Sequence, residues 1–269
     1  MKPILTFLIF ISTLAGINAQ QDSAGLKLLK VYTGDIADFT VDNLGNVYIL
    51  DKGNQLKKLN AAGDSVGVYN DVRRFGKLHS IDASNPLKLL LYYKDYGTIV
   101  VLDRFLNVRN TISLPAISIF QVKAICQSYD NGIWLYDEQD ARLKRLNDEG
   151  AVTGQSSDLR MVMDVIPSPV HISDQDRLVY LYDPEKGIFV FDYFGTLKNR
   201  VPLQGWEDFQ VVGSHAFGRR NTTMLQYQPG SLSLKEQPLP RILEGVTKVR
   251  ISAPGLYCLK DGIIKLYAF

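Results

Sequence analysis

Three histidines are the residues of this sequence best suited to acid–base or metal chemistry: His79, His171 and His215. A metal site would need them to converge with carboxylates such as Asp82 or Asp174, because imidazole and carboxylate groups are usual zinc ligands. None of the three has the spacing of a His-Glu-x-x-His pair, in which one helix turn presents two ligands together. The sequence therefore predicts no metal ligands, and we expect isolated polar residues at strand ends.

Nucleophilic catalysis has no clearer motif. Ser80 and Ser173 lie close to histidines in the chain, but neighbouring strand residues point to opposite faces, and no Gly-x-Ser-x-Gly elbow occurs. Phosphate loops and dinucleotide fingerprints are likewise missing. We therefore expect no cofactor and no catalytic residue. Three further carboxylates are interpreted as turn formers that close strands, not as catalytic groups: Asp51, Asp137 and Asp183.

The first residues have the pattern of a secretory signal. Lys2 is followed by the apolar run 4–15, and the segment 17–19 ends in a small residue before Gln20. Residues 1–19 are therefore the expected signal peptide. No later stretch approaches the roughly 20 apolar residues that cross a bilayer as a helix. We expect a periplasmic protein, with secretion as the second choice.

The charge balance argues against a nucleic-acid partner. The chain has 30 Lys and Arg residues against 28 Asp and Glu residues, whereas nucleic-acid binding usually requires a strong basic surface. Paired basic residues do occur, and we interpret them as solvated strand ends and turns. These pairs are Lys57-Lys58, Arg73-Arg74, Lys144-Arg145 and Arg219-Arg220.

An internal repeat of about 40 residues organises the chain and decides the expected fold. Each copy has one apolar strand, a polar turn, and a second strand that ends in Asn or Asp before a glycine. Clear copies occupy 47–63, 133–150 and 179–195, and weaker ones occupy 89–107, 224–230 and 256–267. The apolar runs are typical of sheets that are buried on both faces. Six such copies predict an all-β, six-bladed β-propeller with four-stranded antiparallel blades.

The repeated glycines are predicted to be structural. A hairpin turn of this kind ends in a residue with positive φ, which glycine adopts without a steric penalty. The turn glycines are Gly63, Gly150, Gly195 and Gly230. In the second copy Leu106 stands at the glycine position and Asn107 follows it. Because Asn tolerates left-handed backbone, we expect a shifted turn there.

The two chain ends are expected to share one blade. The last repeat stops after its third strand, which leaves an open sheet edge. The segment 27–32 precedes the first repeat and has the composition to supply the missing outer strand. The expected domain is thus a single propeller over 20–269, with 20–34 as the closing segment.

The repeats resemble those of NHL-type and related six-bladed propellers, and the similarity extends over residues 20–269. The chain also resembles the compact exported propellers of Bacteroidota cell envelopes, some of which accompany outer-membrane barrels and secretion machinery. This resemblance implies a fold and an envelope location. It implies no particular reaction.

Placed on this fold, the cysteines and several aromatic residues can be interpreted. Cys126 and Cys258 fall in blades on opposite sides of the ring, too far apart for the roughly 7 Å that a disulfide requires, so both are expected to be buried free thiols. Five aromatic residues fall in or near turns, where exposed rings could bind a partner. They are Tyr96, Phe105, Tyr193, Phe194 and Trp206.

Two functions remain open at this point. The favoured one is a non-catalytic periplasmic protein-binding propeller, an accessory subunit that docks on an outer-membrane barrel or secretion translocon. The alternative is a metal-dependent hydrolase or lyase that acts on a sugar, lactone or glycan, with a cation in the channel. Apolar residues at inner-strand points disfavour the calcium site of propeller lactonases. These residues are Phe39, Val41, Ile81 and Ile125.

Overall fold

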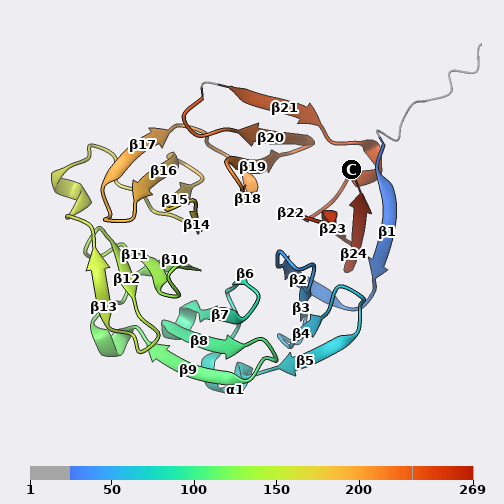
Figure 1. Cartoon of the computed structure of the whole chain (residues 1–269), viewed down its shortest axis with the longest axis horizontal. Helices are drawn as coiled ribbons and strands as arrows, with labels where there is room; N and C mark the ends of the chain where they lie inside the picture. Colours follow the sequence, from blue (N-terminus) through green and yellow to red (C-terminus); the bar gives the residue numbers. More distant parts are fainter. Residues whose placement is uncertain (1–24, 232, 269) are drawn as a thin grey trace, which may run out of the picture.

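Six four-stranded antiparallel sheets surround a central channel in the computed structural model, which describes residues 25–231 and 233–268 (Figure 1). Within each blade the strands follow one another from the channel outward in chain order, except in the last. The predicted six-bladed propeller is therefore confirmed. The expected signal peptide, residues 1–19, lies outside the described residues.

The first three blades follow the chain without interruption. Blade 1 contains β2 (Ile36–Val41), β3 (Val47–Asp51), β4 (Leu56–Leu59) and β5 (Ser65–Tyr69). Blade 2 contains β6 (Ser80–Asn85), β7 (Lys88–Tyr93), β8 (Thr98–Asp103) and β9 (Val108–Ser113). Blade 3 contains β10 (Val122–Gln127), β11 (Ile133–Asp137), β12 (Arg142–Leu146) and β13 (Val152–Gln155).

The remaining blades complete the ring. Blade 4 contains β14 (His171–Gln175), β15 (Leu178–Asp183), β16 (Gly187–Asp192) and β17 (Leu197–Val201). Blade 5 contains β18 (Glu207–Val212), β19 (His215–Arg220), β20 (Thr223–Tyr227) and β21 (Leu234–Pro238). Blade 6 contains β22 (Lys248–Ser252), β23 (Gly255–Lys260), β24 (Ile263–Ala268) and β1 (Lys27–Tyr32).

Helical structure is confined to short turns in the connections between strands. These are α1 (Val72–Phe75), η1 (Lys94–Tyr96), η2 (Pro115–Ile117), η3 (Leu159–Met161) and η4 (Arg241–Leu243). Within the described part of the chain, no helix is long and apolar enough to span a membrane.

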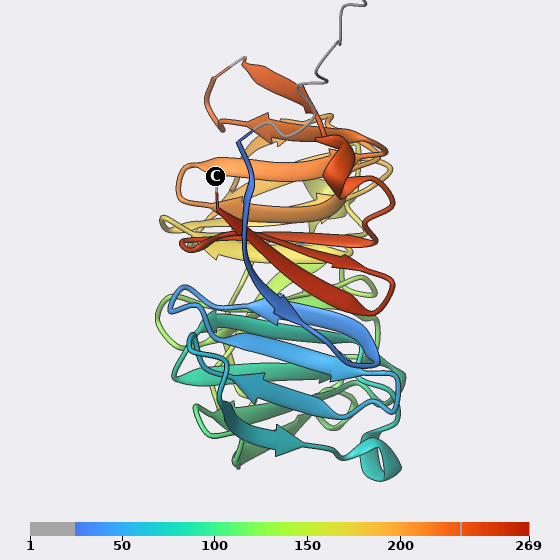
Figure 2. The same cartoon turned by 90° about the vertical axis from the view of Figure 1, so that its right-hand side faces the viewer.

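The N-terminal strand closes the ring as predicted. β1 lies antiparallel against β24 and is the outer strand of blade 6 (Figure 2). Leu28 is opposite Tyr267 and Tyr32 is opposite Ile264, with a register shift between Leu28 and Lys30. Tyr32 is buried in the core between blades 6 and 1. One sheet is therefore built from both ends of the chain, which pairs the edge that β24 would otherwise expose.

The continuous apolar runs reflect burial on both faces of each blade. In β7 every residue is buried. Leu89 and Leu91 pack in the core shared with blade 1, whereas Leu90 and Tyr92 pack in the core shared with blade 3. The strand alternation of period two thus divides one apolar run between two cores. Six such cores separate the six blades.

The repeated turns are built as their residues predict, with one exception. All four turn glycines have positive φ: Gly63, Gly150, Gly195 and Gly230. The expected shifted turn at Leu106 does not occur. Leu106 itself takes a φ of 69°, and Asp103 Oδ1 accepts from the N–H groups of Phe105 and Asn107 at 2.8 and 2.9 Å. Leu106 is buried between blades 1 and 2, and this packing offsets the backbone strain.

The basic pairs are less solvated than expected. Lys58, Lys144 and Arg219 are buried. In the three pairs that lie on strands, alternation buries one member, which finds acceptors there, whereas Arg73 and Arg74 in α1 are exposed. Lys58 Nζ donates to the carbonyl of Arg104 in the next blade at 2.8 Å, and Lys144 Nζ lies 2.7 Å from Asp137 Oδ2. The interpretation as solvated residues is therefore wrong for these three.

The two ends of the channel open on different faces of the ring. Because neighbouring strands are antiparallel, the loops after first and third strands lie on one face, which we call the turn face. The loops after second strands and the connections between blades lie on the other, which we call the crossover face. Each inner strand therefore begins at the crossover face and ends at the turn face.

Candidate functional site

The central channel encloses a cavity with a volume of about 770 Å³. Its wall is formed by the inner strands β2, β6, β10, β14, β18 and β22 (Figure 1). Its lining includes the apolar residues that the sequence suggested, Phe39, Val41, Ile81 and Ile125. Polar and charged side chains, such as Asp82 and Ser173, line it as well.

At the crossover face the channel wall carries three basic side chains. They are His171 at the start of β14, and Lys248 and Arg250 on β22. Burial lowers the pKa of His171 to about 3, and the charges of Arg250 and Lys248 add to this effect. His171 is therefore neutral at physiological pH. Its Nε2 lies 2.9 Å from Ser173 Oγ, and its ring meets Phe209 edge-on.

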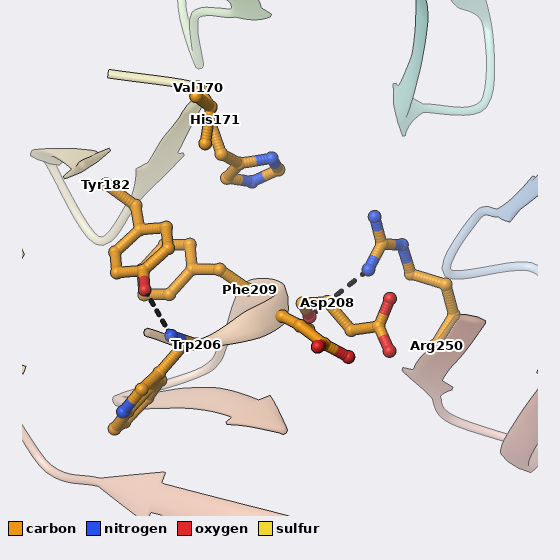
Figure 3. Close-up of a pocket in the computed structure, with 8 residues that line it drawn as sticks. Val170, His171, Tyr182, Trp206, Asp208, Phe209 and Arg250 are labelled. Carbon is orange, nitrogen blue, oxygen red and sulfur yellow. Dashed lines mark hydrogen bonds between the residues drawn. The ribbon is translucent and has the colours of Figure 1, made fainter. Parts of the chain in front are cut away.

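A smaller pocket of about 260 Å³ adjoins this end of the channel (Figure 3). His171 and Arg250 line both cavities and point into the pocket from opposite sides. The back wall is aromatic: Tyr182 stacks on Phe209 with ring centroids 4.5 Å apart. The hydroxyl of Tyr182 accepts from the N–H of Trp206 at 2.5 Å. The pocket therefore combines an aromatic wall with groups of both charges, because Glu207 and Asp208 line it together with His171 and Arg250.

On the turn face, an aromatic cluster is held between blades 3 and 4. Tyr129, in the loop after β10, contacts Tyr193 with ring centroids 4.4 Å apart, and Tyr193 meets Trp134 edge-on at 5.4 Å. The guanidinium of Arg145 lies 5.0 Å from the centre of the Tyr193 ring and 5.5 Å from that of Trp134. Cation–π contacts of this kind stabilise ring orientation.

Asp174 holds this cluster in place through hydrogen bonds. Its Oδ2 accepts from Trp134 Nε1 at 3.0 Å, and from the N–H of Tyr129 and Ser128 Oγ at 3.2 Å each. Ser128 Oγ also hydrogen bonds the hydroxyl of Tyr193. Burial raises the pKa of Asp174, and these hydrogen bonds oppose the shift. The carboxylate therefore fixes the loop that presents Tyr129.

Around the cluster, the turn face exposes further large apolar side chains. Tyr129 is 63% exposed and Phe194 is 87% exposed. The others come from the loops and turns of blades 1 and 2 and are Leu44, Leu87 and Phe105. The crossover face also exposes large apolar side chains, among them Phe120, Met161 and Val162. The turn face is distinguished by rings that other side chains hold in place, a feature of protein-binding surfaces.

The structure separates the aromatic residues predicted to bind a partner. Phe105 and Phe194 lie exposed on the turn face, where half-buried Tyr193 supports Tyr129. Tyr96 is also exposed, but it lies in η1 on the crossover face. Trp206 is only 4% exposed, so its assignment to an exposed surface is wrong. It packs in the core between blades 4 and 5 and against Gly218, whose lack of a side chain makes room for the indole.

The residues considered for catalysis do not form a shared site. His79 and His171 line the channel, whereas His215 begins β19 and does not. The expectation that a nearby serine would point away from its histidine is wrong for Ser173, because residues two apart share a strand face. Among the residues with described positions, no three His, Cys, Asp or Glu side chains are grouped to hold a metal ion. Both cysteines are buried and free.

Sequence reasoning missed Tyr129, Lys248 and Arg250. Tyr129 precedes Asp130-Asn131-Gly132, a turn sequence that could have indicated an exposed ring. Lys248 and Arg250 are separated by one residue on an inner strand, a spacing that places both side chains on one face. Neither signal shows which residues of other blades lie opposite.

Comparison with known proteins supports the fold and no more. No protein-family model matches the sequence, and neither does any curated protein. The solved structures that resemble it include the Pan2 WD40 domain of Neurospora crassa, at 8% identity and a TM-score of 0.67, with 90% of this chain and 94% of that chain covered.

Two lyase structures and a checkpoint assembly have related folds. A streptogramin B lyase is 13% identical with a TM-score of 0.61, and 91% of this chain and 86% of that chain are covered. An inactive virginiamycin B lyase from Staphylococcus aureus, with quinupristin, is 13% identical with a TM-score of 0.60, covering 89% and 88%. A chain of the mitotic checkpoint complex is 10% identical with a TM-score of 0.57, covering 100% and 99%. Because these propellers include lyases and members of assemblies, the fold alone assigns no function.

Proposed function

We propose that this protein is a non-catalytic docking module that binds a protein partner through the turn face. The observation that carries the proposal is the fixed aromatic cluster between blades 3 and 4. Tyr129 and Phe194 are exposed beside Tyr193, whose ring is held by Trp134, Arg145 and Ser128. Rings that are already ordered lose little entropy on binding, and such residues dominate interface energetics.

The proposed partner is an integral outer-membrane protein, either a barrel or a subunit of a secretion translocon, and the proposed location is the periplasm. The expected signal at residues 1–19 supports export, and the resemblance to exported envelope propellers supports the class of partner. Propellers in assemblies such as the mitotic checkpoint complex agree with a scaffold role at the level of fold.

The proposal is tested by site-specific photo-crosslinking in intact cells. A photoreactive amino acid replaces Phe194 or Tyr129 on the turn face, or Phe120 on the crossover face, which is also exposed. We expect one outer-membrane protein to crosslink from positions 194 and 129 and not from 120. Crosslinking from 120 alone would place the interface on the wrong face and overturn the proposal.

Substitution provides the matched functional test. The double variant Tyr129→Ser, Phe194→Ser should no longer co-purify with that partner from detergent-solubilised envelopes, whereas Phe120→Ser should. Elemental analysis of the purified protein tests the alternative function. Stoichiometric calcium or zinc, with a large chelator-dependent fall in melting temperature, would instead favour the hydrolase or lyase.

A further inference from the structure

Arg250 is a half-buried cation that lines both the pocket and the channel. Its Nη1 donates to the backbone carbonyls of Asp208 and Val249, at 3.2 Å each. Among residues 25–231 and 233–268, no ion pair involves this guanidinium, and its other nitrogens have no hydrogen-bond partner. Burial lowers the pKa of Arg250, because the charged form is less well solvated there than in water, and the charges of Asp208 and Asp38 oppose this shift. A partly desolvated cation without a direct ion pair gains from binding an anion.

The nearby carboxylates are already engaged by other cations. Arg219 lies 3.0 Å from Asp208 Oδ2 and 2.5 Å from Glu207 Oε2, which neutralises both acids although they line the same pocket as Arg250. Asp38 lies 2.5 Å from Lys248 Nζ. The charges of these six residues balance in sum. Of the three cations, Arg219 and Lys248 pair directly with carboxylates, whereas Asp208 and Asp38 act on the charge of Arg250 only from beyond ion-pair distance.

The space in front of Arg250 is suited to an oxyanion. Figure 3 shows the guanidinium and the imidazole of His171 facing one pocket, which joins the channel at these two residues. In the tautomer whose Nε2 accepts from Ser173 Oγ, neutral His171 has its single N–H, on Nδ1, free to donate to a ligand. The planar guanidinium matches the two oxygens of a carboxylate or phosphate, and the channel, whose lining is partly apolar, can accept the rest of a ligand.

We propose that Arg250, His171 and Lys248 form an anion site that binds the carboxylate or phosphate group of a small molecule held in the central channel. The site lies at the crossover-face end of the channel. It is therefore distinct from the turn-face surface proposed for the protein partner, and the two can be occupied together.

Calorimetric titration of the purified protein with sodium phosphate and, separately, sodium acetate tests the site at constant ionic strength. We expect saturable binding of at least one anion. Arg250→Met should weaken anion binding tenfold or more, because the guanidinium N–H groups that bind the oxygens are lost. Asp38→Asn should tighten it severalfold, because Lys248 is released and one negative charge is removed. Binding of phosphate alone identifies a phosphate group as the ligand moiety, and binding of acetate alone identifies a carboxylate.

Lys77→Met is the matched control, because Lys77 is an exposed cation on the same face. The affinity of the Lys77→Met variant for either anion should equal that of the wild type. If Arg250→Met does not fold, proton NMR of the wild type decides the question: phosphate or acetate should shift the ring signals of His171 and leave those of His215 unchanged. Absence of any anion-dependent shift, or unaltered affinity in a folded Arg250→Met protein, would overturn the proposal.

Discussion

Gly195 lies so close to Ser156 of the neighbouring blade that a Cβ atom added at Gly195 would be 2.8 Å from the Cα of Ser156. Ser156 cannot move away easily, because its N–H donates to the carbonyl of Leu143 and its Oγ donates to that of Ser157. The turn glycine therefore serves the packing between blades 3 and 4 as well as the backbone conformation of its own hairpin.

Gly195→Ala should consequently be much more destabilising than Gly230→Ala. Both glycines have φ near 80°, but an added Cβ at Gly230 meets no atom within 4 Å. We expect Gly230→Ala to lower the free energy of unfolding by about 1 kcal/mol, because alanine must adopt left-handed backbone there. For Gly195→Ala we expect about 3 kcal/mol, because overpacking adds to the same strain. Chemical denaturation measures both values, and equal losses would show that the contact with Ser156 relaxes without cost.

Closure of the ring can be tested at Tyr32. This side chain is buried between blades 6 and 1, so Tyr32→Ala should cost about 3 kcal/mol and lower the melting temperature by roughly 10 °C. Val31 points outward on the same strand, and Val31→Thr should leave stability nearly unchanged. Deletion of 20–33 should cause aggregation by exposing β24. A wild-type melting curve for Tyr32→Ala would contradict a structural role for β1.

The pH dependence of stability should contain a contribution from His171. Its pKa is about 3 in the folded protein and 6.5 in the unfolded chain, so only the unfolded chain takes up this proton between those values. Stability is therefore lost as pH falls below 6.5. Because water in the channel weakens the effect, we expect the free energy of unfolding to fall by only on the order of 1 kcal/mol between pH 7.5 and pH 5.

His171→Gln should make stability depend less on pH between 7.5 and 5. His215→Gln should leave this dependence unchanged, because His215 lies outside the channel. Urea denaturation at pH values from 7.5 to 5 provides the measurement. If the slopes of the wild type and His171→Gln coincide, the imidazole takes up its proton in the folded state and the assignment of a neutral His171 is wrong.

Both cysteines should be unreactive in the folded protein. Burial raises the pKa of Cys126 well above its usual value and raises that of Cys258 to about 12, so neither forms thiolate near pH 8. Iodoacetamide should label neither residue in buffer and both in concentrated urea. Mass spectrometry of the labelled, non-reduced chain checks this, and detection of a Cys126–Cys258 disulfide would contradict the structure.

The repeat made the architecture predictable because its turn residues and buried strands act locally. Asn60 and Asp192 open their turns with hydrogen bonds to backbone N–H groups that follow within four residues, so the sequence alone contains the whole interaction. Tertiary packing overrode the local signal at Leu106. A leucine holds left-handed backbone there because its side chain is buried between two blades.

The functional surfaces were less predictable, because they join residues from different blades. Trp206 follows a turn-like segment, and only packing on Gly218 and Tyr182 buries it. Asp174 resembles a metal ligand in the sequence, yet it accepts hydrogen bonds from Trp134 and the loop of Tyr129, in another blade.

The sequence by itself determined the number of blades, the turn positions and the strand that closes the ring, since each depends on a period or on contacts within a few residues. Only the tertiary structure decided which aromatic rings are exposed together and which channel cation has no direct ion pair among the described residues. Those properties depend on distances between residues about 40 or more positions apart, and the sequence does not encode these distances in any local pattern.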